Sequence, residues 1–197
     1  MIPRLPFAAT ILLGSAFINP TTTYFHAPTA LHPRRDDDSE FATAARNARA
    51  AGIDGVELHA SSGYLINQFL NPASNQRTDD FGGPAENRIR FPVMVLKAMA
   101  DAIGADRVGL RFSPGNPYNG MDVANPADTF IPLLKAMAPL DLAYLHVLDM
   151  GLAELDTLAM VRDHSTAPMI VNNMLTAETG RALIDAGRAD AVSFGRA

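Results

Sequence analysis

Segments with strand character alternate with segments with helical character from residue 36 to the end of the chain. The expected strands are short apolar runs, at residues 54–60, 107–113, 141–149, 167–173 and 189–197. The expected helices cover residues 36–52, 86–104, 125–139, 152–164 and 176–187. Because a helix precedes every strand, this order indicates parallel βαβ units that share one sheet.

The first two expected strands alternate between apolar and polar side chains, so they have one face of each kind. The apolar face has Val56, Leu58, Val108, Leu110 and Phe112, and the opposite face has Glu57, His59, Gly109, Arg111 and Ser113. An open sheet covered by helices on both faces reads apolar throughout, so the alternation favours a (β/α)8 barrel over a doubly wound sheet. Five strands are fewer than eight, and the complete barrel takes about 250 residues. We therefore expect an α/β fold with a partial TIM barrel.

Composition excludes several classes of protein. The chain has 197 residues, no cysteine and a net charge of -5. Disulfide frameworks and thiolate catalysis are excluded, which fits a reducing compartment such as the cytoplasm. The acidic balance argues against a nucleic-acid partner, because phosphate binding needs a basic face. No apolar run reaches the roughly 20 residues of a membrane helix, so no membrane partner is expected.

The first residues, 1–25, do not follow the strand and helix pattern. Arg4 and the apolar residues after it loosely resemble a secretory signal, but Pro3 and Pro6 interrupt the stretch. No clear small-residue cleavage site follows. We therefore expect residues 1–25 to be a poorly defined N-terminal extension, and residues 26–197 to form the barrel domain.

Glu57 and His59 lie in an expected strand, and Tyr64 follows shortly after it. A buried carboxylate needs a partner, and Arg111 on the next strand is the natural candidate for Glu57. The remaining histidines, His146 among them, have no metal-ligand spacing, so no metal is expected. His146 faces inward by alternation, so it is either a core residue or part of the wall of the site, and the core interpretation is preferred.

One long segment carries a resemblance to a known family. The stretch HASSGYLINQFLNPASNQRTDDFGGPAENRIRF follows the first strand, and GLRFSP, DLAYLHV and AVSFGR come later in the same order. Together they resemble the Old Yellow Enzyme family of FMN-dependent ene reductases (NADH:flavin oxidoreductases) over residues 26–197. The resemblance implies barrel strands four to eight, so the chain is interpreted as a fragment without the first three strands.

The resemblance implies an enzyme that reduces small activated alkenes, such as enones and nitroalkenes, with hydride delivered from NADPH or NADH through FMN. His59 matches the family's first donor to the substrate oxygen. Ser62 stands where the second donor, usually Asn or His, is found, and a hydroxyl has a shorter reach. Tyr64 matches the proton donor, since a phenol keeps its proton at neutral pH and acts as an acid in a dry site.

The resemblance also implies contacts with the flavin. Arg111 matches the arginine near the N1 and O2 edge of the flavin ring, and Gly195 and Arg196 match the phosphate site. Where many relatives have Gly-Gly, this chain has Asn173 and Met174. Side chains there obstruct a phosphate unless they turn away, so Asn173 alone is kept as a contact.

Asn75, Arg77 and Asp79 in the long loop are expected to brace it. Two other functions stay open. The chain is a truncated, non-catalytic relative that associates with itself or with a partner chain through open sheet edges, or it is a flavin-free barrel enzyme that binds phosphate esters.

Overall fold

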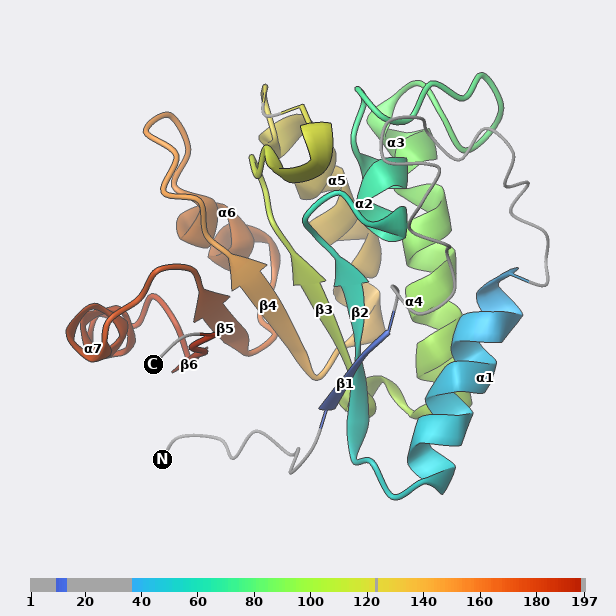
Figure 1. The fold of residues 1–197 in the computed structure, drawn as a ribbon, viewed down its shortest axis with the longest axis horizontal. Coiled ribbons are helices and arrows are strands. Elements are labelled where there is room, and N and C mark those ends of the chain that lie inside the picture. Colours follow the sequence, from blue (N-terminus) through green and yellow to red (C-terminus); the bar gives the residue numbers. More distant parts are fainter. Residues whose placement is uncertain (1–9, 14–36, 123, 196–197) are drawn as a thin grey trace.

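Six parallel strands form one sheet in which every strand pairs with its neighbour in the sequence (Figure 1). The structure, a computed structural model, describes residues 10–13, 37–122 and 124–195. The strands are β1 (Thr10–Leu13), β2 (Gly55–Ala60), β3 (Val108–Phe112), β4 (Tyr144–Leu148), β5 (Met169–Asn172) and β6 (Ala191–Val192). The five expected strands of the partial barrel are therefore confirmed. The sequence pattern did not predict β1, which pairs with β2 and lies within residues 1–25.

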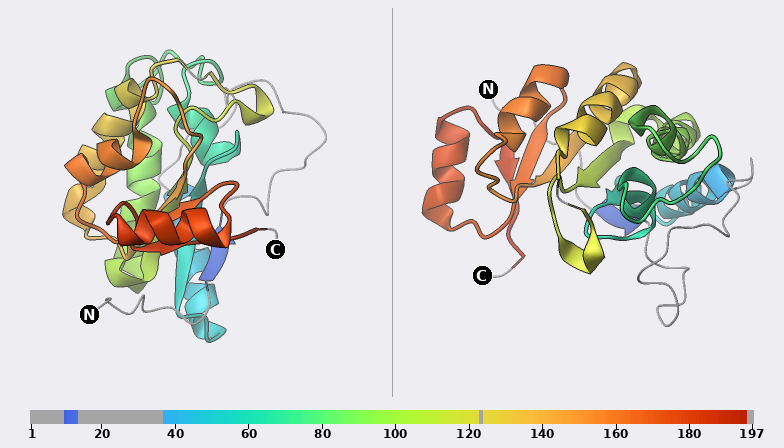
Figure 2. Two further views of the ribbon diagram at one scale, coloured as in Figure 1. Left: turned by 90° about the vertical axis from the view of Figure 1, so that its left-hand side faces the viewer. Right: turned by 90° about the horizontal axis from the view of Figure 1, so that it is seen from above.

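Helices follow the strands in chain order. They are α1 (Asp37–Ala50), α2 (Leu65–Leu70), α3 (Ala85–Arg88), α4 (Arg90–Ile103), α5 (Ala127–Met137), α6 (Thr157–His164) and α7 (Ala177–Asp185). Short 3-10 turns cover Ala105–Arg107, Tyr118–Gly120 and Ala138–Leu140. Seen from above, α1, α4, α5, α6 and α7 lie in an arc on one side of the strands (Figure 2). This one-sided cover is the arrangement of a barrel wall.

The helix boundaries follow local chemistry. The expected helix at 86–104 is divided at Ile89 into α3 and α4, and α4 ends at Gly104, whose φ of 94° suits a helix end. Helix α7 begins with a reciprocal capping box between Thr176 and Thr179. Helix α6 is capped by Asp156, the residue before it, whose carboxylate accepts a hydrogen bond from a backbone N–H of the first turn.

The hydrophobic core lies between the outer face of the sheet and the helices. The strand residues Val56, Leu58, Val108, Leu110 and Phe112 are fully buried there, as the alternation predicted. Burying a side chain of this size contributes about 1.5–3 kcal/mol. The core therefore fixes the apolar face of each strand toward the helices. The polar residues that alternate with these apolar ones then lie on the inner face of the sheet.

At the base of the inner face, an aromatic ring packs against a glycine. Gly109 pairs in register with both Glu57 and Tyr144. A Cβ added to Gly109 would lie 2.3 Å from the Tyr144 ring. Glycine at this position therefore leaves the space that the buried Tyr144 ring fills.

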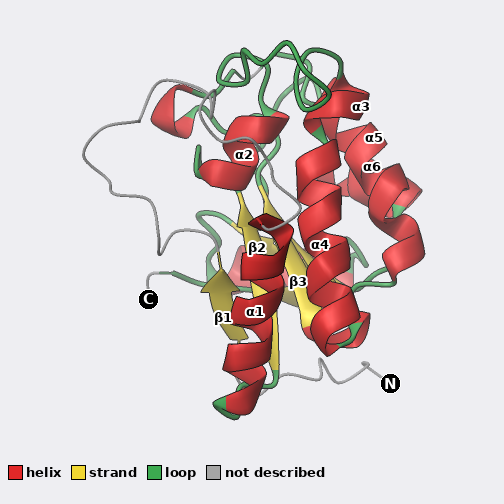
Figure 3. Cartoon of the chain, turned by 90° about the vertical axis from the view of Figure 1, so that its right-hand side faces the viewer, coloured by secondary structure: helices red, strands yellow, loops and turns green. Residues whose placement is uncertain are grey.

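The long loop between β2 and α3 is braced by its own polar residues, as predicted. Asn75 Nδ2 donates to the carbonyls of Phe69 and Phe81, at 2.7 Å each, and its Oδ1 accepts from the backbone N–H of Arg77. The Arg77 guanidinium is in turn paired with Asp79. Within this segment, α2 lies above the carboxyl ends of β2 and β3 (Figure 3). None of the described helices combines the length and apolar character that crossing a bilayer requires.

Candidate active site

The imidazole of His59 and the phenol of Tyr64 meet at the carboxyl end of β2. Their ring centroids are 5.2 Å apart and their planes are tilted by 48°. Tyr64 is 37% exposed, while His59 is half-buried. The chain reverses between them through Ser62 and Gly63, which have φ values of 58° and 75°. This tight reversal returns Tyr64 to a position beside the strand end.

The loop after β3 holds this reversal in place. Ser62 N donates to Ser113 Oγ at 3.2 Å, and Asn119 Nδ2 donates to Ser62 O at 2.8 Å. Asn116 Nδ2 donates to Ser62 Oγ at 3.4 Å. Ser62 is therefore anchored at its amide, carbonyl and hydroxyl to the neighbouring loop, and its hydroxyl also lies 3.5 Å from Ser61 Oγ.

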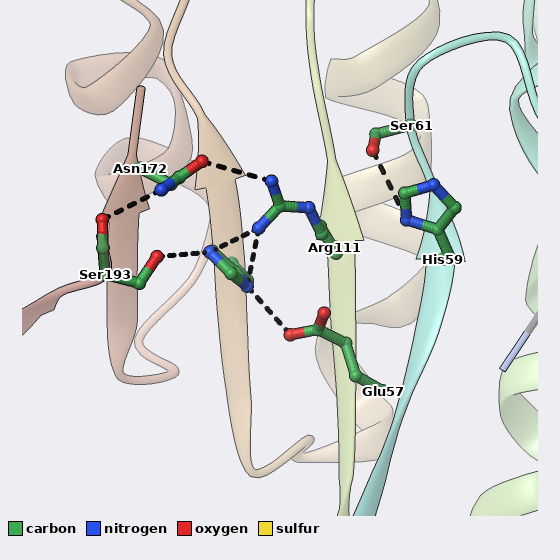
Figure 4. A network of polar contacts seen from close by, with 7 residues as sticks. Glu57, His59, Ser61, Arg111, Asn172 and Ser193 are labelled. Atoms are coloured by element: carbon green, nitrogen blue, oxygen red, sulfur yellow. Dashed lines mark hydrogen bonds and ion pairs between the residues drawn. The ribbon is translucent and has the colours of Figure 1, made fainter. Parts of the chain in front are cut away.

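A serine that the sequence interpretation did not single out contacts His59. Ser61 is fully buried, and its Oγ lies 3.4 Å from His59 Nδ1 (Figure 4). Burial lowers the pKa of His59 to about 4, and the positive charge of Arg111 acts in the same direction, while Glu57 opposes both. His59 is therefore neutral near pH 7. When Ser61 donates to Nδ1, Nε2 carries the proton and is the hydrogen-bond donor.

Arg111 lies at the centre of a polar network that crosses the inner face (Figure 4). Its Nη1 lies 2.6 and 3.1 Å from the two ring nitrogens of His146, and its Nη2 donates to Asn172 Oδ1 at 3.1 Å. Asn172 Nδ2 donates to the carbonyl of Ser193 at 2.8 Å. Burial lowers the pKa of Arg111, and the Glu57 carboxylate opposes that shift.

The expectation that Glu57 pairs directly with Arg111 is corrected by the strand register. Arg111 stands opposite His59, whereas Glu57 stands opposite Gly109. Glu57 reaches across β3 to β4 instead, and its Oε2 lies 2.9 Å from His146 Nδ1. His146 thus lies between the carboxylate and the guanidinium.

The residues expected at the phosphate end are only partly described. Arg196 lies outside the described residues. Gly195 is exposed, and a Cβ added there would meet no atom within 4 Å. Asn173 and Met174 both have positive φ, 119° and 48°. Asn173 Nδ2 donates to Asp149 O at 2.7 Å, while the Met174 side chain is 96% exposed and therefore turned away.

Sequence reasoning missed Asn172 and Ser193 in this inner-face network, and it missed Ser61 beside His59. His146 was interpreted as core, and it is indeed buried, at 9% exposed. The available sequence signal was alternation, which puts His146 on the same strand face as Tyr144, whereas its pairing with Arg111 was known only from the structure. Asn172, rather than Asn173, points inward because β5 continues through residue 172.

The fold and site together define a partial α/β barrel with polar residues at the carboxyl ends of its strands, where barrel enzymes have their active sites. The chain belongs to the NADH:flavin oxidoreductase / NADH oxidase family, whose model matches residues 37–197. This is the family that includes the Old Yellow Enzymes, as the sequence resemblance indicated.

The chain spans about half, or less, of the length of the relatives that it matches. A chanoclavine-I aldehyde reductase of Penicillium roqueforti is 47% identical over 115 residues, which are 58% of this chain and 31% of that protein. A probable flavin mononucleotide-dependent alkene reductase of Leishmania infantum is 40% identical over 157 residues, covering 79% of this chain and 43% of that protein. The solved old yellow enzyme homologue of Zymomonas mobilis matches with a TM-score of 0.76 at 36% identity, covering 83% of this chain and 49% of that one.

Proposed function

We propose that the chain acts in the FMN-dependent reduction of activated alkenes, such as enones and nitroalkenes, with NADPH or NADH as the reductant. The observation that carries this proposal is the convergence of three side chains. The rings of His59 and Tyr64 lie 5.2 Å apart, and Arg111 stands opposite His59 in the strand register. Family membership and the alkene reductase relative of Leishmania infantum support the reaction class.

In this function His59 binds the substrate's carbonyl or nitro oxygen. That oxygen gains negative charge during the reaction, and a donor aimed at it lowers the barrier. The lowered pKa of His59 supports a neutral donor that keeps its proton. Ser62 supplies the second, weaker donor, because its hydroxyl has a shorter reach than an amide or an imidazole.

Tyr64 gives a proton to the α-carbon of the alkene. It is partly exposed and stands against the His59 ring. A substrate whose oxygen is bound by His59 therefore has its carbon skeleton within reach of the phenol. Proton transfer from a positioned side chain contributes about 10²- to 10⁴-fold in rate.

The residues present fit one side of FMN. Arg111 provides a cation on the inner face, and its guanidinium has five N–H donors, more than His146 and Asn172 engage. The open space at Gly195 suits a phosphate close to the backbone. Arg196 and the Asn173 turn complete the proposed contacts. When bound, FMN supplies the hydride for the β-carbon of the alkene.

Titration of the purified chain with FMN tests the cofactor part of the proposal. We expect binding, seen as a change in flavin fluorescence and absorbance. Arg111→Met should weaken it by about ten- to a hundredfold, the worth of a hydrogen bond to a charged group. Arg90→Met, which removes an exposed arginine from α4, is the matched control and should bind as the wild type does. Equal affinity in the wild type and Arg111→Met, or no binding by the folded wild type, contradicts the proposal.

A further inference from the structure

The inner-face network assigns a role to His146, and the inference rests on the function proposed above. We propose that His146 is a positioning residue: Glu57 and Ser193 hold its ring in one orientation and one tautomer, and the ring then holds the Arg111 guanidinium in place for the flavin. His146 itself touches neither the proposed substrate nor the cofactor.

Both ring nitrogens of His146 are engaged by other strands. Nδ1 lies 2.9 Å from Glu57 Oε2, on β2, and Nε2 lies 2.9 Å from Ser193 Oγ, just after β6. His146 is 9% exposed and Glu57 is 3% exposed. The imidazole is therefore largely buried and restrained at both ring nitrogens.

These two contacts also determine the tautomer. A carboxylate only accepts hydrogen bonds, so Nδ1 carries the proton and donates it to Glu57. In the neutral ring Nε2 is then an acceptor, and the Ser193 hydroxyl donates to it. Second partners of this kind commonly fix the ring orientation of functional histidines.

The same geometry places Arg111 over the face of the ring. Nη1 is close to both ring nitrogens of His146, at 2.6 and 3.1 Å. The in-plane directions of those nitrogens point to Glu57 and Ser193. A single atom this close to both would overlap the carbon between them if it lay in the ring plane, so it lies above the plane. A cation is attracted to the face of an aromatic ring.

A second contact completes the hold on Arg111. Nη2 donates to Asn172 Oδ1 at 3.1 Å, and Asn172 is itself bonded to the carbonyl of Ser193. The guanidinium is thus fixed between β4 and β5. Pre-organisation matters for a binding group, because supporting contacts that leave it loose weaken its interaction with the ligand.

The first test needs no cofactor. NMR spectra of the arginine side-chain nitrogens report whether the Arg111 guanidinium rotates freely, and labelled histidine reports which ring nitrogen of His146 carries the proton. We expect slow rotation of Arg111 and protonated Nδ1 in the wild type. His146→Asn should allow fast rotation, and the matched control His164→Asn, on α6, should not. Unchanged Arg111 rotation in His146→Asn overturns the proposal.

Ser193→Ala serves if His146→Asn fails to fold. It removes only the partner of Nε2, so Arg111 should rotate faster than in the wild type and Nδ1 should stay protonated. Unchanged rotation, or a proton on Nε2 in the wild type, again overturns the proposal.

The second test asks whether His146 acts through Arg111. His146→Asn should weaken FMN binding by about tenfold in the wild-type background and add little to Arg111→Met, because coupled residues are not additive. Equal losses in both backgrounds indicate a purely structural role and overturn the proposal. A folded wild type that binds no FMN refutes the proposed function. In that case the NMR result alone decides whether His146 restrains the rotation of Arg111.

Discussion

The His59 imidazole is partly buried and lies near the positive charge of Arg111. Both lower its pKa, to about 4, and Glu57 only partly offsets them. The consequence for chemistry is a neutral donor over the whole range in which most enzymes operate. The consequence for folding is a dependence of stability on pH, because the unfolded chain has no such environment.

Stability should fall below pH 6.5 in a way that depends on His59. An unfolded imidazole binds its proton near pH 6.5, whereas folded His59 binds it only near pH 4. Between these values the unfolded state binds more protons, so acidification favours unfolding, and the contribution is fully present only above pH 6.5. Urea unfolding of the wild type and His59→Gln between pH 7.5 and pH 4.5 measures this. The wild type should lose more stability than the variant, and parallel curves would refute the assignment.

At the scale of elements, the reversal after β2 depends on the loop after β3. Gly63 has a φ of 75°, and a Cβ there would lie 2.5 Å from Asn119 Cβ and 3.0 Å from the Tyr118 carbonyl. Asn119 in turn donates to Ser62 O. The position of Tyr64 beside His59 therefore depends on close contact between the two loops.

Gly63→Ala should separate the loops and destabilise the protein. Strain at positive φ costs about 1 kcal/mol, and the overlap with Asn119 adds about 1–3 kcal/mol. Gly83→Ala is the matched control, since φ there is 81° but an added Cβ meets nothing within 4 Å. Denaturant unfolding and amide exchange across residues 113–120 measure both. Equal effects of the two substitutions would show that the loop contact contributes nothing.

Some features of the strands and helices could be predicted from the sequence, and others could not. Alternation in VELH and VGLRF was enough to predict the strands, their buried face and the inward direction of Glu57 and Arg111. The register was out of reach, because it depends on how neighbouring strands are staggered, and so the place of His146 between Glu57 and Arg111 was missed. Helix α2 was missed because six residues are too few to show a helical period.

For the whole molecule, the described sheet has β1 and β6 at its two edges, each paired on one side among the described strands. Edge strands of parallel sheets present backbone N–H and C=O groups to other chains. Association through such edges, an alternative that the sequence left open, stays a prediction.

Light scattering coupled to size-exclusion chromatography tests that association. We expect an average mass that rises with protein concentration, because pairing through sheet edges obeys mass action. A constant monomer mass over the accessible concentration range would show that the edges do not pair.

Rapid-mixing kinetics of Tyr64→Phe test the central claim, that Tyr64 protonates an alkene held by His59, most directly. The protein reconstituted with FMN is followed in two separate half-reactions, reduction by NADPH and reoxidation by an enone. Loss of a positioned acid should slow reoxidation by about 10²-fold or more and leave the reduction by NADPH nearly unchanged. Equal slowing of both half-reactions, or reoxidation at the wild-type rate, would contradict the claim.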